Sequence, residues 1–172
     1  FSIAPCMTQT TTKQFYWPDT NVLVTRFLSS EGVGEIEDFM PVGTDTGPDL
    51  FHQLIRRIKV VRGQVTFRLE CHPAFDYART PHETHLSSSG AVFATQALTL
   101  GLATTLPLKR DEQGVFVEFT LQRGEHAVCV LREIADGERC GAVLPDNHAE
   151  TVFQSTIQFW HDWLSHSRYT GR

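Results

Sequence analysis

Apolar and polar residues alternate along most of positions 1–133, and a period of two is the pattern of β-strands with one buried face. The pattern is clearest in 115–121, whose apolar positions share one face: Val115, Val117, Phe119 and Leu121. The run 65–72 repeats it, with inward positions Val65, Phe67, Leu69 and Cys71. Burial of this inner face should dominate stability, so the sequence predicts a cost of about 3–5 kcal/mol for Phe119→Ala.

Weaker alternation predicts further strands at 13–17, 21–28, 34–40, 53–61, 91–96, 98–103 and 126–133. Turn-forming residues separate them: we expect a hairpin at 29–32, tight connections at 62–64 and 123–125, and a longer loop at 43–49. Many short strands at this spacing indicate an all-β domain over residues 1–145, built as an antiparallel sandwich or barrel.

The period changes from two to that of a helix after Pro145. An amphipathic helix is predicted from Ala149 to about Ser165, with its main apolar stripe at Phe153, Ile157, Trp160 and Leu164. Asp146 and Asn147 precede it as N-terminal caps, and Gly171 ends the segment. The stripe fits packing on the chain's own sheet, but its place near the end of the chain and its two tryptophans favour docking on a further domain.

Composition narrows the possible partners. The 172 residues are 41% hydrophobic and 20% charged, which argues against disorder, and no run approaches the length of a membrane span. The net charge is −5, and the densest basic cluster, 55–59, is interleaved with apolar residues as in a strand. We therefore expect no nucleic acid and no membrane as partner, while a neutral polar ligand such as a sugar fits.

The cysteines, Cys6, Cys71, Cys129 and Cys140, form neither a CxxC pair nor a recognisable disulfide framework. Reduced thiols in a cytoplasmic protein are favoured over disulfides. Positions 1–20 lack the pattern of a signal peptide. The chain begins at Phe1 inside an apparent strand and ends directly after the predicted helix, so we expect a piece of a longer polypeptide.

Titratable residues offer three candidates for chemistry. His82 and His85 flank Glu83-Thr84, which is not HExxH, and we expect a solvent-exposed pair on a loop or hairpin arm rather than a zinc site. Glu35 and Glu37 share one strand face and have the residue types of a glycosidase acid and base, although a solvated strand face is the favoured interpretation. Asp76 lies between Phe75 and Tyr77, where a structural hydrogen bond is expected.

Motifs for other catalytic centres are missing from the sequence: there is no GxSxG, no supported Cys–His pair and no glycine-rich phosphate loop. We assign no catalytic or metal-binding residue and no cofactor, and the substrate-binding residues stay undetermined.

Several segments of the sequence form a recognisable set when they are taken in order. The most specific are Pro18–Leu23 (PDTNVL) and Glu37–Val42 (EDFMPV), and the others are Phe1–Pro5, Leu54–Arg57, Val61–Gly63, Phe75–Tyr77 and Phe159–Trp163. Together they resemble one family, the bacterial and archaeal glycoside hydrolase family 15 proteins, which include glucoamylases and trehalase-like enzymes. The resemblance is strongest from Phe1 to Tyr77 and thin between Ala78 and Gly114.

This resemblance implies a two-sheet super-β-sandwich that precedes an (α/α)6 catalytic barrel. In the family the barrel carries two glutamates that hydrolyse α-glucosidic bonds with inversion. Residues 1–145 would then be a non-catalytic domain that supports the barrel, and 146–172 would be the linker helix leading to it. The implied partners are the barrel and, through it, an α-glucoside. Uncovered sheet edges would also permit a homo-oligomer.

Three other functions are compatible with the sequence. A carbohydrate-binding module would use exposed aromatic residues, for which Tyr16, Trp17, Phe75 and Tyr77 are candidates, although core positions are the commoner place for aromatics. The others are a metal-dependent jelly-roll enzyme and a protein-interaction domain.

Overall fold

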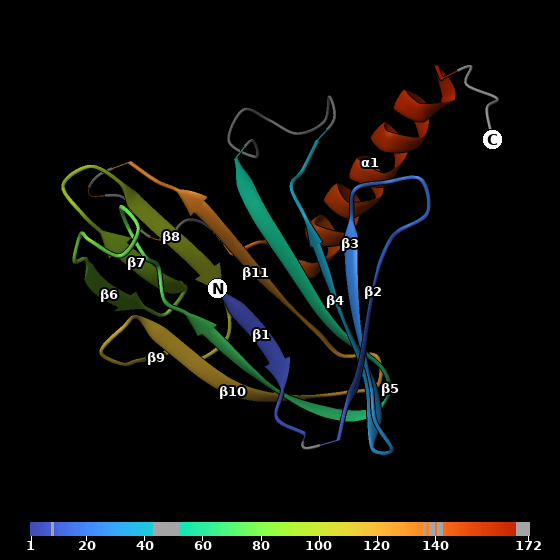
Figure 1. Cartoon of the computed structure of the whole chain (residues 1–172), viewed down its shortest axis with the longest axis horizontal. Helices are drawn as coiled ribbons and strands as arrows, with labels where there is room; N and C mark the ends of the chain where they lie inside the picture. The colour runs from blue at the N-terminus through green and yellow to red at the C-terminus, as the bar shows by residue number, and fades with distance from the viewer. Residues whose placement is uncertain (8, 43–51, 136, 138–139, 141–142, 168–172) are drawn as a thin grey trace.

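A computed structural model of the chain shows an antiparallel β-sandwich with one C-terminal helix (Figure 1). It describes residues 1–7, 9–42, 52–135, 137, 140 and 143–167. The elements are β1 (Ser2–Pro5), β2 (Thr11–Tyr16), β3 (Leu23–Leu28), β4 (Gly32–Phe39), β5 (Gln53–Cys71), β6 (Glu83–Ser87), β7 (Gly90–Ala94), β8 (Thr99–Thr104), β9 (Lys109–Arg110), β10 (Val115–Gln122), β11 (His126–Glu133) and α1 (Asp146–Ser165). The predicted all-β class and terminal helix are confirmed.

The long strand β5 joins the two sheets. Its first half pairs with β4 and β11 in a sheet ordered β2-β3-β4-β5-β11-β8-β7-β6, and its second half pairs with β1 and β10. The prediction of a tight connection at 62–64 between two strands is wrong, because the chain stays extended there and bends at Gly63. Gly63 has a φ of +67°, and a Cβ at this position would lie 2.0 Å from the carbonyl oxygen of Glu31. A glycine is therefore required where β5 passes from one sheet to the other.

The main core lies between the two sheets. The predicted inward residues of 65–72 are all buried there, as are Val115, Val117 and Leu121. Phe119 is only partly buried and stacks on Phe67, with 5.7 Å between the ring centroids. Phe67, which is completely buried, is the central aromatic residue of this core.

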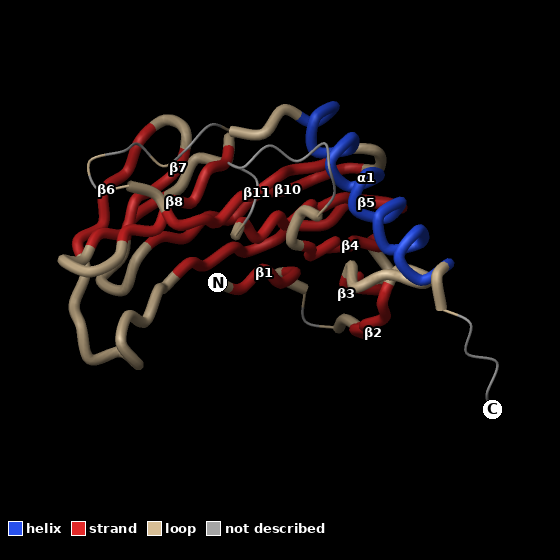
Figure 2. The backbone as a smooth tube through the Cα atoms, turned by 90° about the horizontal axis from the view of Figure 1, so that it is seen from above, coloured by secondary structure: helices blue, strands red, loops and turns tan. Residues whose placement is uncertain are grey.

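Helix α1 covers the opposite face of the larger sheet (Figure 2). Its Val152, Phe153 and Ile157 pack with Phe39 and Val130 in a second core. The helix begins at Asp146, earlier than predicted, and its N-cap is Pro145 without a side-chain cap bond. Asp146 and Asn147 thus lie in the first turn rather than capping it. The predicted loop 43–49 and Gly171 lie outside the described residues.

The other predicted turns within the described residues agree with the structure. The hairpin at 29–32 and the turn at 123–125 are present, and His85 lies on a hairpin arm, β6, as expected. The two-residue strand β9 was not predicted, because so short a run carries no detectable alternation. Among the described residues, no helix is both long and apolar enough to cross a membrane.

Candidate functional site

Glu35 and Glu37, the paired carboxylates of β4, are buried rather than solvated. They are 4% and 0% exposed, so the expectation of a water-facing strand is wrong. Lys59 Nζ lies 2.5 Å from Glu37 Oε1 and 3.3 Å from Glu35 Oε2, and Arg26 Nε lies 2.5 Å from Glu35 Oε1. The Arg57 guanidinium is 3.1 Å from Glu37 Oε2. These carboxylates are therefore paired with cations of β3 and β5.

The same ion pairs connect the sheet to the helix. Arg57 pairs with Glu150 of α1, and its guanidinium carbon lies 4.3 Å from the centroid of the Phe153 ring. A hydrogen bond from Gln154 lowers the pKa of Glu150; burial opposes this shift and Arg57 reinforces it. His126 Nε2, at the start of β11, lies 3.0 Å from Asp146 Oδ2 in the first turn of α1. Charged contacts thus fix the N-terminal half of α1 on the sheet.

A pocket of about 530 Å³ adjoins this cluster. It lies between β5, the 124–126 turn and the first turns of α1, and its charged lining residues are Glu37, Arg57, Lys59, Glu125, Asp146 and Glu150. Most of these charges are already paired with one another. The arrangement stabilises the helix–sheet contact and offers no free acid–base pair.

Sequence reasoning missed the partners Arg57 and Lys59, although a signal was present. Because side chains alternate along a strand, Glu35 and Glu37 share the face of Phe39, and Arg57 and Lys59 share the face of Ile55. Phe39 and Ile55 both belong to the core beneath α1. Two carboxylates and two cations on faces that also carry core residues indicate a buried ion cluster.

A second feature is the turn that follows β5, residues 75–79. Asp76, Tyr77 and Ala78 have φ values of 46°, 58° and 64°, so three consecutive non-glycine residues are left-handed. Each such residue costs roughly 1–2 kcal/mol relative to the right-handed conformation. Phe75 is buried in the main core, whereas Tyr77 is 89% exposed. The backbone carbonyl of Asp76 accepts hydrogen bonds from the backbone N–H and the Nε of Arg79, both at 3.1 Å. Its carboxylate, for which a structural hydrogen bond was expected, lies 3.6 Å from Arg79 in an exposed ion pair.

The two predicted loop histidines have different environments. His85 is exposed, as expected, and its Nε2 lies 3.3 Å from a carboxylate oxygen of Glu83. His82, expected to be exposed, is instead partly buried between the rings of Phe75 and Phe93, whose centroids lie 5.3 and 5.8 Å away. Desolvation, assisted by the charge of Arg110, lowers the pKa of His82. Within the described part of the chain, no three His, Cys, Asp or Glu residues are placed to hold a metal ion.

Beside the turn 75–79 lies an open pocket of about 630 Å³. Its polar lining residues are His72, Arg79, Thr80, His82, Glu112 and Gln113. At its edge, His72 Nε2 lies 2.9 Å from Asp111 Oδ2. The other carboxylate oxygen of Asp111 accepts hydrogen bonds from the backbone N–H groups of Gln113 and Gly114. Although desolvation acts in the opposite direction, these bonds and His72 lower the pKa of Asp111.

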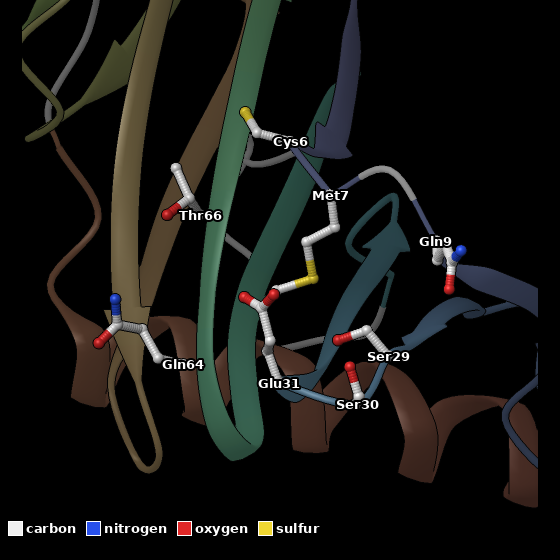
Figure 3. A pocket seen from close by; sticks show the side chains of 8 residues that line it. All are labelled: Cys6, Met7, Gln9, Ser29, Ser30, Glu31, Gln64 and Thr66. Atoms are coloured by element: carbon white, nitrogen blue, oxygen red, sulfur yellow. The ribbon is translucent and has the colours of Figure 1, made fainter.

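The pocket shown in Figure 3 has a less convergent set of lining side chains. It lies near the bend of β5 and holds about 580 Å³. Met7 and Glu31 point toward one another, whereas Gln64 and Thr66 lie on the other side of the β5 ribbon. Its side chains do not converge on one point, so we assign no ligand to it.

Cys6, Cys71 and Cys129 are free thiols, and Cys140 Sγ contacts the hydroxyl groups of Ser87 and Ser89. Cys6 is exposed, whereas the other three cysteines are buried. Burial raises the pKa of Cys71 to about 11 and that of Cys129 to about 12. Buried thiols that resist ionisation are poor nucleophiles.

The C-terminal half of α1 carries an exposed aromatic surface. Phe159, Trp160 and Trp163 stack edge to face, with centroids 5.5 and 5.9 Å apart. Trp163 is 60% exposed, Phe159 and Leu164 are each 37% exposed, and the buried residues of the helix all precede Gln158. Figure 1 shows this end of α1 extending past the strands. The first half of the helix therefore packs on the chain's own sheet, as one alternative predicted, and its second half is largely exposed. Docking on a further domain stays a prediction.

Of the four aromatic residues considered for sugar stacking, two are exposed. Trp17 packs against Phe153 at 5.5 Å, and Phe75 lies in the core. Tyr16 on β2 and Tyr77 in the strained turn are exposed. Neither tyrosine is among the residues that line the pockets described above.

Comparison with known proteins finds relatives along nearly the whole chain. No family model matches. A trehalase of Thermoplasma acidophilum is 27% identical over 161 residues, which cover 92% of this chain and 27% of that protein. A trehalase of Thermoplasma volcanium is 25% identical over 160 residues, covering 92% of this chain and 25% of that protein. The chain thus spans about a quarter of the length of these relatives, and its sequence is similar to that of archaeal trehalases.

Proposed function

We propose that this chain is the non-catalytic β-sandwich part of a glycoside hydrolase that cleaves α-glucosidic bonds, of the trehalase or glucoamylase type. The observation that carries the proposal is the similarity of 92% of the chain to two archaeal trehalases about four times its length. In the proposed protein, as the resemblance to glycoside hydrolase family 15 implies, hydrolysis with inversion takes place in an (α/α)6 barrel outside these residues.

The buried state of the carboxylates supports a non-catalytic role for the sandwich. An inverting glycosidase needs two carboxyl groups that face one cavity on opposite sides of the scissile bond. Glu35 and Glu37 are instead buried and form ion pairs with the partly exposed Arg26 and Lys59. Hydrolysis by the sandwich would require other groups.

The surface formed by Phe159, Trp160, Trp163 and Leu164 is the proposed contact with the catalytic domain. Trp160 Nε1 is buried and has no hydrogen-bond partner among the described residues. Apolar patches of this kind mark protein interfaces. In the proposed protein, the barrel covers this surface and the rigid sandwich supports the loops around the barrel's substrate pocket.

Two preparations test the proposal: this chain alone, and the longer polypeptide that continues from it. Alone, the chain should release no glucose from trehalose or maltose, and the longer polypeptide should release it. Glucose release by purified chain alone would overturn the non-catalytic role. Lack of hydrolysis by the longer polypeptide would overturn the assignment to this enzyme class.

The docking surface has its own test. Trp163→Ser should leave the thermal midpoint of this chain nearly unchanged and lower that of the longer polypeptide, because only there is the indole covered. Leu86→Ser, at an exposed apolar residue of β6, is the matched control. It should change the thermal midpoint of this chain and that of the longer polypeptide by the same amount. Equal effects of Trp163→Ser in both proteins would contradict the docking. Sedimentation of the chain alone shows whether a second copy covers the same surface.

A further inference from the structure

We infer that the turn 75–79 and the pocket beside it form a binding site for a neutral pyranoside, with Tyr77 as the stacking residue. The choice of a glucose-containing ligand rests on the proposed function, whereas the site itself rests on geometry. The site is distinct from the α1 surface. Figure 1 shows β5 ending beside β6, β7 and β9, on the side of the molecule away from α1.

The strained backbone is the first argument. Left-handed non-glycine residues persist only where the surrounding structure holds them, and they cluster at functional sites. Here three occur in succession, at Asp76, Tyr77 and Ala78. Their conformation presents an aromatic ring to solvent, since Tyr77 is 89% exposed. A turn serving only to connect β5 to β6 would have no need for this conformation.

The turn is also rigidly held, which favours binding. Phe75 fixes its start in the core, and the backbone N–H of Thr80 donates to the carbonyl of Phe75 at 3.3 Å. Arg79 binds the carbonyl of Asp76, and its guanidinium lies 5.5 Å from the centroid of the Tyr77 ring. A side chain already held in place loses little conformational freedom when a ligand stacks on it.

The chemistry of the adjacent surface selects the ligand. The pocket displays the guanidinium of Arg79, the carboxylate of Glu112 and the amide of Gln113, which together donate and accept hydrogen bonds as neighbouring sugar hydroxyls require. The lining carries one arginine and one carboxylate, Arg79 and Glu112, so their charges balance and suit a neutral ligand. Tyr77 lies outside this lining, but its ring centroid is 5.5 Å from the guanidinium carbon of Arg79, which belongs to it. An aromatic ring beside such groups accommodates the apolar face of a pyranose.

Isothermal titration of this chain with trehalose and with maltotetraose tests the site. We expect binding of at least one sugar, a loss of roughly tenfold in affinity for Tyr77→Ala, and near-retention for Tyr77→Phe, which keeps the ring. Tyr16→Ala removes an exposed tyrosine on the distant strand β2 and should leave affinity unchanged. Tyr77 contributes little to the core, so these variants should fold.

Failure to bind either sugar, or equal affinities for Tyr77→Ala and the unmodified chain, would overturn the inference. The same experiments distinguish failure of the Tyr77 site from failure of the proposed function. If the longer polypeptide hydrolyses trehalose while this chain binds no sugar, only the Tyr77 site is wrong. If the chain binds sugar through Tyr77 and the longer polypeptide hydrolyses no α-glucoside, the site stands and the enzyme class is wrong.

Discussion

The guanidinium of Arg57 lies over the ring of Phe153, 4.3 Å from its centroid, and joins β5 to α1. The same group faces the carboxylate of Glu37, which is completely buried. Arg57 therefore neutralises a charge on the sheet and provides packing surface for the helix. Its removal affects both the buried ion cluster and the helix contact.

Replacing Arg57 by Met should lower the free energy of unfolding by about 3 kcal/mol, because removing one partner of a buried ion pair leaves the other incompletely compensated. Lys59 still neutralises part of the Glu37 charge, so we expect a loss at the lower end of the range for such changes. Urea denaturation at pH 7 measures the effect. Arg79→Met, at an exposed arginine, is the control, and an equal loss in both variants would refute the importance of the cluster.

Removing the carboxylate as well should restore stability. When Arg57→Met is combined with Glu37→Leu, Lys59 still pairs with Glu35, and Glu150, which loses Arg57, is half exposed to water. Apolar replacements of buried ion pairs are often neutral. We expect the double variant to be more stable than Arg57→Met alone in the same urea assay. A double variant that is less stable than both single variants would show that the ion pair itself holds the helix.

Phe67→Ala should destabilise the protein by about 3–5 kcal/mol, because it opens a cavity between the sheets. Phe119→Ala should cost less, since that ring is partly exposed and loses mainly its stacking on Phe67. Gly34 reflects the same tight packing: a Cβ there would lie 2.6 Å from Phe67 Cζ. The denaturation midpoints of the two variants show which substitution destabilises the protein more. A greater loss of stability for Phe119→Ala would mean that Phe67 is not at the centre of the core.

His82 should make stability depend on pH. Its pKa is lower in the folded protein, so between the two pKa values the unfolded chain binds more protons. Its contribution is complete above the unfolded value of about 6.5 and decreases as the pH falls toward the folded pKa. Thermal midpoints between pH 7.5 and roughly 5 should therefore fall less for His82→Phe than for the unmodified protein. His85→Phe, at the exposed histidine, should retain the full pH dependence.

The rate of thiol modification should distinguish the exposed cysteine from the buried ones. Cys6 is exposed and should react first with a disulfide reagent at pH 8, whereas burial and pKa values of about 11 and about 12 should protect Cys71 and Cys129 until the protein unfolds. Cys6→Ser should abolish the fast phase. Rapid reaction of that variant in the native state would show that the core opens locally.

The alternation of apolar residues predicted most of the strands because the period of side chains along a strand is a local property. It correctly placed the inward residues of 65–72 and the hairpin arm that carries His85. It did not predict that β5 is continuous, because Gly63 resembles a turn in sequence and only its pairing with Gly32 of β4 shows that the strand continues.

Among the site residues, the sequence identified Asp76 and Tyr77 as unusual, but their left-handed backbone depends on the anchoring of Phe75 in a core assembled from distant strands. The sequence alone thus determined which residues share a strand face, and hence the all-β class and the amphipathic helix. Only the tertiary structure decided what covers each face. Glu35 and Glu37 became buried ion-pair residues because the rest of the fold brings cations and α1 against their side of the sheet. The strand pattern shows which residues share a face with them, and the pairing of the strands decides that the charges meet.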